Sequence, residues 1–142
     1  MRLGNDLSFV EITYRAKEPE GSPGHGNVSY SVVASSNTFR GEIPSVWFSR
    51  ENLDDFLRQL DQLNRTRNGS ITLSNLSSLS EYNPLVLDIF SIDNSGHLGV
   101  KVRLFRLSYD WEEEEALKLS ISFPLDNDRF AEVVAGFRKL FN

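Results

Sequence analysis

Apolar residues alternate with polar ones in several segments of the chain, whereas in two others they recur every third or fourth position. Alternation predicts strands with one buried face, and the longer spacing predicts amphipathic helices. We expect one helix to begin after Ser49 and end near 64–68, and a second to follow Asp126 or Asp128, because these residues can cap a first turn. The predicted apolar stripes are Leu53, Phe56, Leu57, Leu60 and Leu63, and Phe130, Val133, Val134, Phe137 and Leu140.

About seven strands are expected around these helices, three before the first helix and four between the two. They are predicted near 7–14, 28–35, 39–48, 71–73, 85–90, 98–105 and 117–123. Short turns between successive strands favour antiparallel pairing. The order βββα-ββββα therefore predicts an α+β fold, an antiparallel, meander-like sheet with both helices packed on it. Residues 1–142 should form a single domain, and the matching helix stripes raise the alternative of two related halves.

Three local features sharpen this prediction. Prolines and glycines crowd 18–27, which we interpret as a surface loop, and Asp93-Asn94-Ser95-Gly96 is typical of a tight turn. Trp47 lies between apolar neighbours and is expected in the core. Two adjacent apolar residues, Leu104 and Phe105, interrupt the alternation, and a β-bulge would explain them.

Composition restricts the classes of function. The chain has no cysteine, so disulfides, thiolate chemistry and thiolate metal sites are excluded. A net charge of −5 argues against a nucleic-acid partner, because phosphate binding needs a basic surface. We see neither a signal peptide nor an apolar run long enough to span a membrane, and we expect a cytoplasmic protein.

Residue sets for catalysis are not recognisable in the sequence. The two histidines, His25 and His97, fall in a loop and beside a turn, with no serine elbow and no metal-ligand spacing. Gly24-His25-Gly26 lacks the rest of a dinucleotide-binding fingerprint. We therefore predict no catalytic residue, no metal and no cofactor.

The most unusual segment is a run of acids around a tryptophan, expected at the tip of a hairpin. An aromatic anchor inside an acidic patch is typical of surfaces that attract a basic protein, although the same residues could form only a solvated tip. The predicted partner-binding residues are Asp110, Trp111, Glu112, Glu113, Glu114 and Glu115. Lys101, Arg103 and Arg106 suggest a smaller basic strip, more typical of the solvated side of a strand.

Several stretches, taken in order, resemble the WapI-like family of bacterial immunity proteins. The resemblance implies a cytoplasmic protein without catalytic residues that binds and blocks a cognate toxin. It covers most of the chain from Val28 onward. The stretches are Phe39-Arg40-Gly41, Ser49-Arg50-Glu51-Asn52-Leu53, Gly69-Ser70-Ile71-Thr72-Leu73, Gly96-His97-Leu98-Gly99-Val100, Leu119-Ser120-Ile121-Ser122-Phe123 and Asp126-Asn127.

Three hypotheses follow. The first is an immunity protein that neutralises a basic toxin, such as a nuclease, through the acidic surface. The second is a generic protein-interaction or regulatory module, with a homodimer left open. The third is an enzyme or small-ligand binder that uses the concave side of a curved sheet.

Overall fold

The computed structural model describes residues 1–75, 84–110 and 113–142, with the backbone alone at 107–110 and 113–116. Eight strands, two α-helices and one short 3-10 helix follow one another in these parts of the chain. They are β1 (Arg2–Gly4), β2 (Ser8–Lys17), β3 (Val28–Ser36), β4 (Phe39–Phe48), α1 (Arg50–Thr66), β5 (Ser70–Ser74), β6 (Leu85–Ser91), β7 (Leu98–Asp110), β8 (Glu113–Pro124), η1 (Asn127–Arg129) and α2 (Phe130–Phe141).

The strands form two antiparallel sheets of four, in the orders β1-β2-β3-β4 and β5-β6-β7-β8. The α+β class is confirmed, but the expected single sheet of seven strands is wrong. The helix α1 separates β4 from β5, so the strands before it and the strands after it form separate sheets. Each sheet buries one apolar face against the other, because the two helices alone could not cover both faces. Both halves thus contain four strands followed by a helix.

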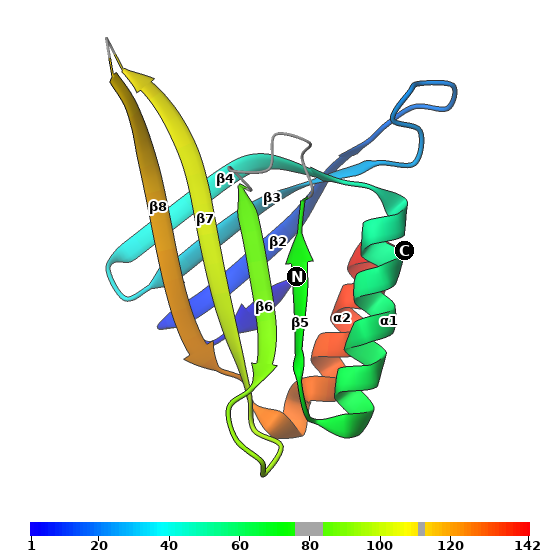
Figure 1. Cartoon of the computed structure of the whole chain (residues 1–142), viewed down its shortest axis with the longest axis vertical. Helices are drawn as coiled ribbons and strands as arrows, with labels where there is room; N and C mark the ends of the chain where they lie inside the picture. The colour runs from blue at the N-terminus through cyan, green and yellow to red at the C-terminus, as the bar shows by residue number, and fades with distance from the viewer. Residues whose placement is uncertain (76–83, 111–112) are drawn as a thin grey trace.

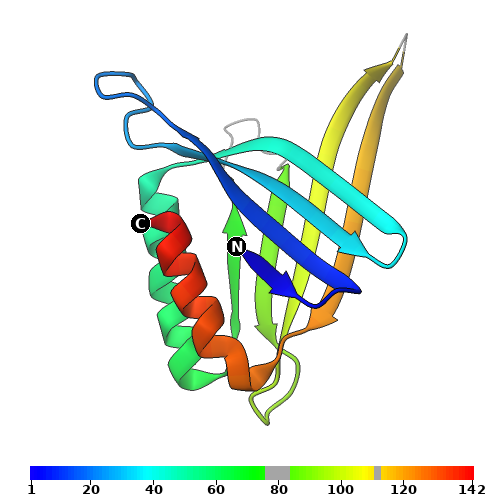
Figure 2. The same cartoon turned by 180° about the vertical axis from the view of Figure 1, so that it is seen from behind.

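The two sheets lie face to face with their strands crossing, and the helices lie together beside β5 (Figures 1 and 2). Buried residues of both sheets and both helices belong to the same hydrophobic core. Its aromatic centre lies where α1 and α2 meet β3. The ring of Phe56 on α1 contacts that of Phe137 with centroids 5.0 Å apart, and Tyr30 contacts Phe141 at 5.4 Å.

The helix ends follow the capping residues. The Ser49 side chain accepts a hydrogen bond from the Asn52 amide at 3.2 Å, as predicted for the start of α1. Arg67, with a left-handed φ of 53°, ends this helix inside the expected interval. Asp126 caps the 3-10 turn η1 by accepting from the Asp128 amide, so α2 itself begins only at Phe130.

Two local expectations about the strands are wrong. Trp47 is 40% exposed, because a register shift in β4 near Pro44 turns Val46 and Phe48 inward and Trp47 outward. No bulge occurs at Leu104 and Phe105, since β7 pairs with β8 without interruption from Gly99 to Asp110. Leu104 is instead the last residue of β7 that pairs with β6, and beyond it the strand leaves the core.

Candidate protein-binding site

Strands β7 and β8 continue past the rest of their sheet (Figure 1). The last β6–β7 pair is Leu85 with Leu104, and the Phe105 amide donates to the Pro84 carbonyl at 3.0 Å. Further out, the described parts of β7 and β8 pair only with each other. We call residues 106–110 and 113–117 the arm; they form a two-stranded ribbon that the sheet holds at one end only.

Four of the six predicted partner-binding residues are described, and they lie at the far end of this arm. Asp110 is the last residue of β7 and pairs with Glu113, the first residue of β8, while Tyr109 pairs with Glu114. Trp111 and Glu112 lie outside the described residues. The expected hairpin is therefore confirmed, and its role in binding stays a prediction.

The net charge of the protein is concentrated at this tip. The chain has 15 basic and 20 acidic residues, which gives −5. Five acids, Asp110 and Glu112–Glu115, lie within six consecutive positions. The remaining chain therefore has 15 acids against 15 bases and is neutral overall. Such a concentration acts on a charged partner at long range, because fields from like charges add.

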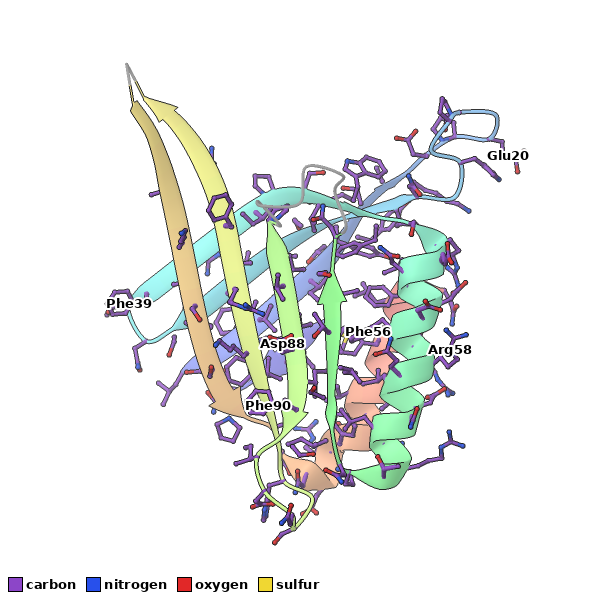
Figure 3. All side chains as sticks on the ribbon, viewed as in Figure 1. Glu20, Phe39, Phe56, Arg58, Asp88 and Phe90 are labelled. Carbon is purple, nitrogen blue, oxygen red and sulfur yellow. The ribbon has the colours of Figure 1, made fainter. Side chains whose placement is uncertain are left out.

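At the base of the arm, apolar and basic side chains border a groove of about 470 Å³. It lies between the β3–β4 hairpin and the arm. Phe39 is 70% exposed and Leu117 is 54% exposed, and both line it. Figure 3 shows Phe39 at the outer end of the β3–β4 hairpin. On the opposite face of the ribbon, Lys118 lies over the ring of Phe105, 5.6 Å from its centroid.

Sequence reasoning missed this groove because its two walls come from distant parts of the chain. Gly41 on β4 provides the close approach, since a Cβ there would lie 2.9 Å from a methyl carbon of Leu119. The one usable signal was Phe39, a large apolar residue placed directly after a predicted turn. Alone it did not indicate which segment it would face.

The proposed basic strip does not form on one face. Lys101 and Arg103 are exposed on the outer side of the second sheet, whereas Arg106 alternates to the other side and lines the groove. Arg103 donates to Asp88 at 2.9 Å, and Asp88 accepts from Thr72 at 2.6 Å. One of the two outer bases is therefore paired with an acid of the same sheet.

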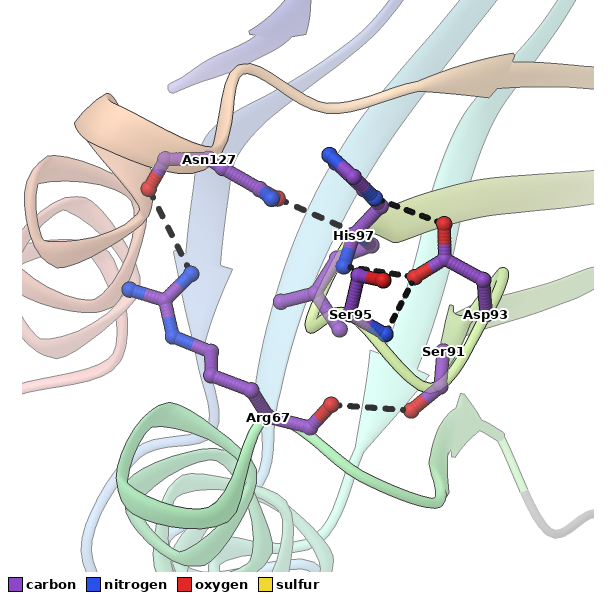
Figure 4. A network of polar contacts seen from close by, with 7 residues as sticks. Arg67, Ser91, Asp93, Ser95, His97 and Asn127 are labelled. Atoms are coloured by element: carbon purple, nitrogen blue, oxygen red, sulfur yellow. Dashed lines mark hydrogen bonds and ion pairs between the residues drawn. The ribbon is translucent and has the colours of Figure 1, made fainter.

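A second hollow, of about 680 Å³, is lined by polar residues at the ends of α1, η1 and the β6–β7 turn. Figure 4 shows the polar contacts around it. The Arg67 guanidinium donates to the Asn127 carbonyl at 3.3 Å, and the Asn127 side chain accepts from the Leu98 amide. The Ser91 hydroxyl donates to the carbonyl of Arg67. These bonds join the end of α1, the β6–β7 turn and η1.

Within this network His97 pairs with a carboxylate. Its Nδ1 lies 2.6 Å from Asp93, whose other oxygen accepts from the Ser95 amide. The side-chain hydrogen bond to His97 lowers the pKa of Asp93. A catalytic triad would also need a hydroxyl on the imidazole, but the Ser91 hydroxyl donates to backbone carbonyls instead. These contacts hold the predicted tight turn against the end of α1 and against η1, so a structural role is enough to explain them.

The described parts of the chain offer few other groups for chemistry. Within the described parts of the chain, three or more potential metal-ligating side chains do not cluster anywhere. In the same residues no helix has the length and apolar character needed to cross a membrane. His25, the second histidine, is exposed in the loop before β3.

Comparison with known proteins gives no match: no protein-family model, curated protein or solved structure is significantly similar to the chain. The geometry and charge of the arm and its groove are therefore the structural basis for inferring a function.

Proposed function

We propose that this chain is an immunity-type protein that binds and neutralises a cognate basic toxin through the tip of the β7–β8 arm. The observation that carries the proposal is the distribution of charge, because five acids at the tip account for the whole net charge of −5. The proposal places the protein in the cytoplasm, without a cofactor. The resemblance to the WapI-like immunity family supports the same role.

The arm has the properties of a presented binding element. It projects from a sandwich that anchors only its base (Figure 1), so a partner can reach both of its strands. Carboxylates at such a tip attract a basic surface before contact and raise the association rate. On a nuclease toxin, whose substrate-binding surface must attract phosphates, they would occupy the positions of the phosphates.

Retaining these acids lowers the stability of the hairpin. Asp110 and Glu113 are directly opposite in the register, and like charges at such positions destabilise a strand pair. A two-stranded ribbon is itself only marginally stable in water. A feature that opposes folding in this way is typical of a functional surface.

The test measures association of the purified protein with the isolated toxin-like domain encoded beside its gene. An arm variant changes Asp110, Glu112, Glu113, Glu114 and Glu115 to the matching amides. A control variant removes the same amount of charge from exposed acids elsewhere, namely Asp6, Glu20, Glu51, Asp128 and Glu132.

We expect the arm variant to associate at least about tenfold more slowly at low salt, and to lose most of its salt dependence. The control should stay close to the unmodified protein, because charge away from the interface contributes little at short range. Equal effects of the two variants would show that only total charge matters and would refute a role of the arm.

A generic protein-interaction module is the second candidate, and the groove favours it. Phe39 and Leu117 expose large apolar surface on the border of one hollow. Exposed apolar patches with a polar rim commonly mark protein interfaces. If no toxin-like gene lies nearby, this function becomes the leading one.

A further inference from the structure

The base of the arm carries a charge opposite to that of its tip. Arg106 and Lys118 lie there on opposite faces of the ribbon, because Lys118 is paired with Phe105 and Arg106 with Leu117. Leu117, which borders the groove, is more than half exposed. The base therefore presents positive charge and apolar surface, in a chain whose net charge is −5. A strand that complements it must combine acidic and apolar residues.

Such a segment exists in the chain itself, on the strand that borders the groove. From residue 113, β8 has the sequence Glu-Glu-Glu-Ala-Leu-Lys-Leu, acidic at the tip and then apolar and basic toward the base. Lys118 lies four residues from Glu114, which is about 13 Å along a strand. Tip and base therefore lie on one continuous edge, within reach of a second molecule placed alongside.

That edge has no ladder partner in the described structure. β8 pairs with β7 on one side, and it is the last strand of its sheet. The backbone amides and carbonyls on its outer side are therefore open to another strand, as at any sheet edge. A strand added there would run beside both the acidic tip and the basic base.

We infer that two copies of the chain associate along β8 in antiparallel orientation, so that the acidic tip of each lies beside the basic base of the other. A twofold axis requires a self-complementary surface, and this edge provides one. Placing Ala116, the smallest residue of the segment, on the axis puts Glu114 of each copy opposite Lys118 of the other. Glu113 then lies opposite Leu119, and Glu115 opposite Leu117.

The charge pattern selects this arrangement over its alternatives. A parallel pairing in register would place three glutamates of one copy against three of the other, and like charges at opposite positions are destabilising. The antiparallel offset replaces that repulsion by two Glu114–Lys118 pairs. The inference does not rest on the toxin hypothesis, but the dimer would cover one edge of the same arm and would compete with a toxin for it.

The test measures the oligomeric state of the full chain by sedimentation velocity, from about 1 μM to about 1 mM, a range suited to a small interface. We expect a monomer–dimer equilibrium that weakens with salt. Glu114→Lys and Lys118→Glu should each raise the dissociation constant by about tenfold. Combining them in one chain should restore dimerisation, because each charge again meets its opposite.

The absence of native cysteine allows a direct test of the register. Ala116→Cys should form a disulfide-linked dimer under mild oxidation, since the two positions meet on the axis, whereas Ser120→Cys on the same strand should not. A chain that stays monomeric at about 1 mM would overturn the inference, as would a dimer indifferent to both charge reversals. Toxin binding measured at concentrations where the protein is monomeric tests the proposed function separately.

Discussion

Replacing Tyr30 by Phe removes one hydroxyl from the core and leaves the ring in place. The side chain is 1% exposed, and its hydroxyl donates to the Leu140 carbonyl at 3.2 Å. Loss of one such hydrogen bond lowers the free energy of unfolding by about 1 kcal/mol near neutral pH. The ring contacts with Phe48 and Phe141 should be retained.

At alkaline pH this advantage of the native protein disappears. Burial raises the pKa of Tyr30 to about 12, compared with about 10 for tyrosine in an unfolded chain. The unfolded chain therefore loses the proton at a lower pH than the folded one. The stabilisation from protonated Tyr30 is fully present below the pKa of this tyrosine in the unfolded chain. It is lost as the pH rises through the pKa of Tyr30 in the folded protein. Near pH 11 the native protein loses about 1.4 kcal/mol from this group, and the Phe variant loses none.

The stabilities of the two proteins should therefore become equal near pH 11. Urea unfolding at about pH 8 and about pH 11 measures both free energies. Tyr14→Phe is the matched control, because this tyrosine lies on the neighbouring strand and is 53% exposed. It should differ from the native protein by less than about 0.5 kcal/mol at both values of pH. A difference between native protein and Tyr30→Phe that is the same at the two pH values would refute the reasoning.

Three further predictions concern packing, capping and charge. Gly41→Val should lower the free energy of unfolding by about 1–3 kcal/mol, because even its Cβ would lie 2.9 Å from Leu119. Adding Leu119→Ala should recover part of this loss. An unchanged urea midpoint in Gly41→Val would contradict the close approach of the sheets. Ser49→Ala should cost about 1 kcal/mol of stability in thermal or urea unfolding, while Ser49→Asp should keep the cap and most of the stability. Arg138 donates to both oxygens of Asp61 across the two helices, so Arg138→Gln should lose about 0.2–1 kcal/mol at low salt. The Arg138 effect should vanish in high salt, and a salt-independent loss would mean that the contact acts through packing.

The helices were predictable because capping and periodicity are local properties. Ser49 and the stripe from Leu53 to Leu63 determine α1 without reference to the rest of the chain. The division into two sheets was not predictable, because alternation shows which face of a strand is buried but not what buries it. β1 was missed for a related reason, since Arg2–Gly4 is too short to show a period.

One part of the candidate site could be predicted from the sequence, and the other part could not. The hairpin at Asp110 and Glu113 could be predicted, because four successive glutamates cannot all lie in a half-buried strand. The groove could not, since Phe39 and Leu117 meet only through the crossing of the two sheets. Trp47 was misplaced because a register shift near Pro44, invisible in the hydropathy pattern, reverses the phase of β4.

The order of the strands has a consequence for the speed of folding. In each sheet every strand pairs with its neighbour in sequence, so each hairpin in the described parts of the chain closes over a local loop, the longest of which spans residues 18–27. Short loops have a small closure entropy, and proteins rich in local contacts fold faster than those with long-range pairings. We therefore expect each half to form its meander early, and the crossing of the two sheets at Gly41, which joins distant segments, to limit the rate of folding.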